Sequence, residues 1–184
     1  IEDLKMATTI VIDKNTDITA ISKTDFANIP TSDLSKLTTT QVNSISAEQI
    51  GALTKPESLA ALKQASLSSD VFPAISSKVI SALDLKKVTA DQFNSLDPSQ
   101  IAALTTAQVA AINFYTDMAD EKLGAFTLGA KGNLGAITIS KLGTNISRLT
   151  NDEFASLTGD QLKAAGSLSS VMAAITTDQI QVLT

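Results

Sequence analysis

The sequence predicts an all-α protein, a solenoid or superhelical array of short octad helices with a Gly-rich interruption and minor β structure. Three observations lead to this prediction. An eight-residue phrase recurs in tandem along most of the chain. Each phrase carries the side chains that begin an α-helix. Apolar residues make up 43% of the 184 residues but aromatic residues only 4%, so aliphatic side chains and Ala must supply most of the core.

The eight-residue phrase, which we call an octad, has a defined pattern. A hydroxyl residue or Asp stands first, Gln or an acidic residue fourth, and apolar residues fifth and eighth. From residue 22 it runs without a break as SKTDFANI, PTSDLSKL, TTTQVNSI and SAEQIGAL, and TKPESLAAL follows with one extra residue. Later copies are SSDVFPAI and SSKVISAL (68–83), TADQFNSL, DPSQIAAL and TTAQVAAI (89–112), TNDEFASL and TGDQLKAA (from 150), and LSSVMAAI and TTDQIQVL (from 168).

Each octad is best explained as one short helix followed by a turn. In a continuous helix, eight residues at about 100° each leave about 80° of rotation per octad, so the apolar positions would wind around the axis. A strand is excluded because positions five and eight do not alternate with a period of two. Pro30, Pro56 and Pro98 stand at or near octad starts, where proline suits the first turn of a new helix, whereas Pro73 fits less well inside its octad.

The first half of each octad matches a helix N-terminus. In LTTAQVAAI (104–112), Thr105 is the expected N-cap and Gln108 the N3 residue of a capping box. Leu104 and Val109 flank them as a hydrophobic staple. Helices of one or two turns are unstable alone, so the octads must stack on their neighbours around a shared core. A ladder of position-four Gln side chains that binds a partner is the alternative, but satisfying the helix start is the favoured interpretation.

The repeat divides the chain into four segments. Residues 1–21 are an N-terminal strand or linker, in which TTIVID (8–13) is rich in β-forming residues. Residues 22–112 form the first octad array and residues 150–184 the second. Residues 113–149 are an irregular, Gly-rich insert between them.

Three stretches depart from the octad pattern. SLAALKQASL (58–67) predicts a longer helix of two to three turns, and residues 117–126 predict a helix with an acidic start. The ITIS stretch (137–140) follows most of the glycines of the insert and predicts a loop or a short hairpin.

The composition excludes several classes of function. The chain contains no Cys and no His, so the common nucleophile–base pairs and transition-metal sites are absent. A net charge of −5 argues against nucleic acid and anionic membrane surfaces as partners. No apolar run is long enough to insert into a membrane. The chain starts without a signal peptide and ends where another octad would begin, as expected of a piece of a longer protein.

The sequence assigns no catalytic, cofactor-binding or metal-binding residue, but two stretches suggest a ligand. Asp13, Asn15 and Asp17 are spaced like the start of a calcium loop, although the Gly and the final Glu of an EF-hand are missing. The favoured interpretation of these three residues is a turn between the N-terminal strand and the first octad. Phe114 and Tyr115 could form an exposed platform that stacks on a sugar, with burial in the core as the favoured alternative.

The octads resemble a known class of tandem repeat. The Thr-x-x-Gln-Val/Ile-x-x-Leu pattern of 22–112 and 150–183 is similar to arrays in very large secreted or surface proteins of Gram-negative bacteria, often described as adhesins or haem-utilisation proteins. The resemblance implies an extracellular or cell-surface location and a structural or adhesive role. It carries no functional residue over to this chain. Haem binding gains no support, since only Tyr115, Met6, Met118 and Met172 could ligate iron.

We therefore expect a structural or adhesive repeat segment of a large bacterial extracellular protein, without catalysis. A protein or glycan partner, or self-association with neighbouring repeats of the same chain, stays open. The alternative is a calcium- or glycan-binding module that uses residues 113–143 or 13–17. An enzyme of unfamiliar type is a third, disfavoured hypothesis.

Overall fold

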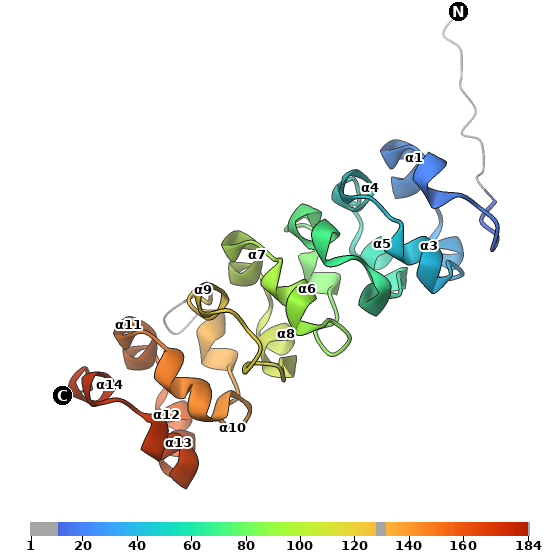
Figure 1. Cartoon of the computed structure of the whole chain (residues 1–184). Coiled ribbons are helices and arrows are strands. Elements are labelled where there is room, and N and C mark those ends of the chain that lie inside the picture. Colours follow the sequence, from blue (N-terminus) through green and yellow to red (C-terminus); the bar gives the residue numbers. More distant parts are fainter. Residues whose placement is uncertain (1–10, 128–131, 184) are drawn as a thin grey trace, which may run out of the picture.

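The computed structural model describes residues 11–127 and 132–183. Within these ranges every regular element is a helix and none is a strand, which confirms the all-α prediction. The helices follow one another in an elongated row, and the first and last described residues lie at opposite ends of it (Figure 1). No helix in the described ranges is long and apolar enough to cross a membrane.

The described residues form fourteen short α-helices and six 3₁₀-helices. The α-helices are α1 (Lys23–Ala27), α2 (Thr31–Leu34), α3 (Thr39–Asn43), α4 (Ala47–Gly51), α5 (Pro56–Ala61), α6 (Ala90–Asn94), α7 (Pro98–Ala102), α8 (Thr106–Ala111), α9 (Asp120–Leu123), α10 (Ile139–Leu142), α11 (Asn151–Ala155), α12 (Gly159–Gly166), α13 (Ser169–Ala174) and α14 (Thr177–Gln181). The 3₁₀-helices are η1 (Ile18–Ala20), η2 (Gln64–Ser66), η3 (Ser69–Ala74), η4 (Ile80–Ala82), η5 (Asn133–Ala136) and η6 (Gly143–Arg148).

The predicted capping boxes start many of these helices. At α8, Thr105 Oγ1 accepts a hydrogen bond from the Gln108 amide at 3.2 Å, and Gln108 Oε1 accepts one from the Thr105 amide at 2.9 Å. The same reciprocal pair of bonds begins α3, α4, α6, α11, α12 and α14. Each pair satisfies two amide groups that the helix itself leaves without an acceptor.

The apolar octad positions form one continuous core. Position-five side chains such as Phe26, Ile50 and Val109 are completely buried, and position-eight side chains such as Leu37 and Leu96 are buried as well. Many of the short helices pack on the helix three places later in the chain, as α1 does on α4, α2 on α5 and α11 on α14. Short helices with little stability of their own are thus held by contacts across the row.

Several predicted boundaries differ from the structure. The helix predicted over 58–67 is two helices, because α5 ends at Ala61 and η2 begins at Gln64. Of the helix predicted over 117–126, only α9 forms. The ITIS hairpin is wrong, since its last two residues begin α10. Within TTIVID, residues 11–13 form no strand and the rest lies outside the described residues.

The insert at 113–149 includes four short helices among its described residues. It contains α9, η5, α10 and η6, and these pack on the octad helices before and after them, as η5 does on α8 and η6 on α13. Aromatic contacts continue the core into it: Phe93 of α6 lies 5.4 Å from Phe114 and 6.5 Å from Phe126, measured between ring centroids. The glycine content of the insert therefore did not prevent helical packing.

Candidate functional site: the amide ladder and the Arg148 corner

The position-four glutamines are buried although they are polar. Gln49, Gln92, Gln100 and Gln179 are at most 5% exposed, and Gln41, Gln108 and Gln161 are nearly as well covered. Burying an amide is unfavourable unless its hydrogen bonds are made. The partners of these side chains therefore explain why the octads carry Gln.

Each position-four Gln connects its own helix to a segment that lies far away in the sequence. Gln108 uses Oε1 at its own helix start, and its Nε2 donates to the Ile80 carbonyl at 2.8 Å and the Leu83 carbonyl at 2.7 Å. Gln49 Nε2 donates in the same way to Ile18 and Ile21, both at 2.8 Å. We call this set of bonds the amide ladder. Its other glutamine donors are Gln41, Gln92, Gln100, Gln161 and Gln179.

The acceptors of the amide ladder follow a rule. In most cases they are the carbonyls of two buried apolar residues three positions apart, such as Phe72 and Ile75 for Gln100 or Ile146 and Leu149 for Gln179. In an octad these are positions five and eight. They lie at the C-terminal end of a short helix, where carbonyl groups lack an intrahelical donor. One Gln therefore completes the start of its own helix and the end of an earlier one.

Where the octad pattern is interrupted, other side chains donate the hydrogen bonds to distant carbonyl groups. Asn133 Nδ2 donates to the carbonyls of Ile101 at 2.8 Å and Leu104 at 3.2 Å. Lys122 Nζ donates to the Leu96 carbonyl at 2.8 Å, and Lys63 Nζ donates to the Leu37 carbonyl in the same way. The bond across the row is thus kept even where the capping box is absent.

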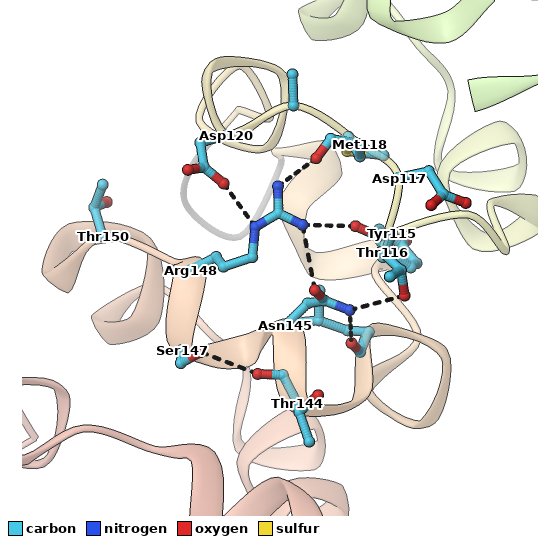
Figure 2. Close-up of polar contacts among 12 residues, drawn as sticks. Tyr115, Thr116, Asp117, Met118, Asp120, Thr144, Asn145, Ser147, Arg148 and Thr150 are labelled. Carbon is cyan, nitrogen blue, oxygen red and sulfur yellow. Dashed lines mark hydrogen bonds and ion pairs between the residues drawn. The ribbon is translucent and has the colours of Figure 1, made fainter. Parts of the chain in front are cut away.

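The only arginine of the chain occupies the equivalent place in the insert (Figure 2). Arg148 Nη1 donates to the Tyr115 carbonyl at 2.8 Å and Nη2 to the Met118 carbonyl, again two residues three positions apart. Its Nε contacts Asp120 Oδ1 at 2.6 Å, and Nη1 also reaches Asn145 Oδ1 at 3.2 Å. We call these five residues the Arg148 corner. Since all three guanidinium nitrogens donate hydrogen bonds, the corner connects η6 to the 115–120 segment.

The suggested calcium ligands are used in local turns. Asp13 Oδ1 accepts hydrogen bonds from the Asn15 amide and the Thr16 hydroxyl, and these bonds lower the pKa of Asp13. Asp17 is the N-cap of η1, and the Thr19 hydroxyl and amide lower its pKa. Both carboxylates already have partners, as the favoured turn interpretation expects.

The suggested sugar platform is not on the surface. Tyr115 is 1% exposed, and its hydroxyl donates to the Val109 carbonyl at 3.4 Å. Phe114 is partly buried against Phe93. The alternative of an exposed platform is wrong and the favoured burial in the core is confirmed, because both rings extend the core from α6 into the insert. Burial also places Met118 in the core, whereas Met172 is exposed.

The sequence did not predict the bonds that the Gln Nε2 groups make to carbonyls of distant segments. A capping box predicts only the bonds within one octad, and either Glu or Gln can make them. The signal was that Gln is more frequent than Glu at the fourth position, since only Gln has an N–H group left to donate. The distance of 25 and 28 residues to the acceptors of Gln108 is set by packing and has no local signature.

The described residues bring together no group of three or more His, Cys, Asp or Glu side chains that could hold a metal ion. What the arrangement can do chemically is to satisfy backbone polar groups between stacked helices. Comparison of the chain with models of known families, with curated proteins and with solved structures finds no significant match.

Proposed function

We propose that the chain is an α-solenoid segment with a structural or adhesive role in a large bacterial extracellular or cell-surface protein, and that it catalyses no reaction. The observation that carries this proposal is the amide ladder. The recurring polar residue of the octads is consumed in bonds between helices, as in Gln49, Gln100 and Gln179. A side chain repeated for contact with a partner would instead be exposed.

The outward face of the octads supports an extended surface for contact. Thr106 and Ala107 of α8 are exposed, whereas Gln108 and Val109 beside them are buried. Because the same exposed positions recur in each octad, a ligand would meet many similar weak contacts, and their combined strength would hold a surface. A localised pocket is not required for such binding.

The structural part of the proposal is tested by small-angle X-ray scattering of the chain and of a tandem fusion of two copies. A solenoid that continues through the junction should give a maximum dimension that grows nearly in proportion to length. A tandem fusion that scatters as two freely jointed bodies would contradict continuous stacking.

The adhesive part is tested with beads coated with the chain and presented to cells or glycans. Charge substitutions at Thr106 and Ala107 should change bead retention only slightly, because equivalent octads remain. The matched variant Val109→Asp should unfold the surrounding helices and lose retention together with helix content. An outward substitution that abolished retention without changing the melting curve would indicate a localised site and overturn the proposal.

The proposed location is tested on cells that produce the parent protein. Protease added to intact cells should remove the epitope of an antibody raised against this chain. An epitope that is degraded only after cell lysis would place the segment inside the cell.

A further inference from the structure

The fourth residue of the octad that contains α11 differs from the glutamines of the amide ladder. Glu153 stands where half of the octads have Gln, and it is 4% exposed. Its Oε2 accepts hydrogen bonds from the Thr150 amide at 2.7 Å and the Thr150 hydroxyl at 2.9 Å, so the capping box is complete. Its Oε1 has no hydrogen-bond partner, and it is the only such buried side-chain atom in the part of the chain that the structure describes.

The rule for the acceptors predicts two carbonyl groups opposite this oxygen. Residues 119–126, which contain α9, resemble an octad, and their fifth and eighth residues are the buried Leu123 and Phe126. Glu153 Oε1 lies against Gly124 between them, 3.5 Å from where a Cβ on that glycine would be. No side chain in the described residues donates to either carbonyl, and Lys122, the basic residue of α9, is turned to the Leu96 carbonyl.

By analogy with the glutamine bonds elsewhere in the row, the Leu123 and Phe126 carbonyls are the groups that a donor at the Glu153 Oε1 position would meet, and Oε1 has no hydrogen to donate to them. Where the amide ladder has Gln, the side-chain Nε2 group stands at the place of Glu153 Oε1 and donates its two N–H groups to two carbonyls, as Gln108 does. A buried carboxylate is strongly disfavoured unless it is paired or coordinates a metal. Carboxylate and carbonyl oxygens are the ligands preferred by hard cations.

We propose that Glu153 Oε1 and the carbonyls of Leu123 and Phe126 bind a hard cation of the Ca²⁺ type, which replaces the amide donor in this rung. Ca²⁺ tolerates irregular oxygen geometry and completes its shell with water, whereas Mg²⁺ demands a near-ideal octahedron. A single carboxylate makes this a weak site, since affinity rises with the number of charged ligands. The cation would connect α11 to α9 across the row.

The test compares thermal melts of the whole chain in CaCl₂, MgCl₂, NaCl and choline chloride at matched ionic strength. For the wild type we expect Ca²⁺ to raise the melting temperature by about 2–4 °C over choline at the same ionic strength. Glu153→Gln restores the amide donor, so this variant should melt higher than the wild type in choline and should not respond to Ca²⁺. Glu57→Gln makes the same change at an exposed position and should keep the response of the wild type.

A converse variant tests the chemistry at another rung. Gln100→Glu places a carboxylate opposite the Phe72 and Ile75 carbonyls, so it should lower the melting temperature in choline and gain a response to Ca²⁺. Should this variant fail to fold, Glu153→Gln still decides the matter. Equal melting of the wild type in all four salts would overturn the proposal. So would a Ca²⁺ response that survives Glu153→Gln, or a wild type stabilised by acid rather than by any cation.

Discussion

Gln108 shows how much one side chain contributes when it completes two helix ends. Its Oε1 accepts from the Thr105 amide, and its Nε2 donates to the Ile80 and Leu83 carbonyls. Thr105 supports the same helix start but makes only local bonds. The two residues therefore separate capping from long-range bonding at one octad.

The first prediction compares these two residues. Thr105→Ala should lower the free energy of unfolding by about 1 kcal/mol, the usual loss for an N-cap. Gln108→Ala should cost more, about 2–3 kcal/mol, because it leaves buried carbonyl groups without their donor. Urea denaturation followed by circular dichroism measures both values. Equal losses in the two variants would mean that the long-range bonds add nothing to stability.

A second prediction concerns Tyr115, the single tyrosine of a chain without tryptophan. Burial raises the pKa of its hydroxyl. An unfolded tyrosine loses its proton near pH 10, roughly its ordinary value, while the folded one keeps it. The stabilisation is therefore full below about pH 10 and is lost as the pH rises above that value.

The measurement is an alkaline titration with two readings. Tyrosinate absorbance should appear together with the loss of helical circular dichroism, and Tyr115→Phe should unfold at a higher pH than the wild type. A tyrosinate signal that rises near pH 10 in a fully helical sample would show that the ring is accessible to hydroxide.

Among the elements, α6 shows why a five-residue helix persists. Its capping box joins Thr89 and Gln92, and Gln92 Nε2 donates to the Leu67 carbonyl at 2.7 Å. Phe93 is completely buried between earlier and later elements and contacts Phe114 and Phe126. The element is thus defined by partners outside it, because a single turn does not repay the cost of nucleation.

The third prediction tests that dependence. Phe93→Ala should lower the free energy of unfolding by about 3–5 kcal/mol, as expected for a large buried aromatic residue. Phe93→Leu keeps more of the apolar volume and should cost less. Hydrogen exchange should show the loss first in α6, α9 and η3, and protection lost evenly along the chain would contradict local stacking.

On the scale of the whole molecule, stability should vary along the row. Interior helices are packed on both sides, whereas the last described helices expose apolar side chains: Met172 is 47% exposed and Ile180 is 52% exposed. In a chain stabilised by contacts between neighbours, an element with fewer neighbours opens more readily.

The fourth prediction follows from this asymmetry. In native-state hydrogen exchange, amides of α13 and α14 should exchange faster than those of α7 and α8. Gln179→Ala removes the bonds from α14 to Ile146 and Leu149 and should speed exchange in α14 without affecting α3. Uniform protection from α3 to α14 would show that the chain unfolds as a single cooperative unit.

The sequence by itself determined the helix starts and the core positions. Thr105 and Gln108 begin α8 as predicted, and Phe26, Phe72, Phe93 and Phe154 are buried at the fifth position. Both features are local, since a capping box lies within four residues and an apolar pattern needs only its own period.

Only the tertiary structure decided which helices meet and what the glutamines bind. The acceptors of Gln108 lie 25 and 28 residues away, and no local pattern fixes that spacing. The same packing turned the Gly-rich insert into helices, buried Tyr115 and left Glu153 Oε1 facing backbone instead of a donor. These features depend on contacts between distant segments, whose energies are set by the assembled row and not by any one octad.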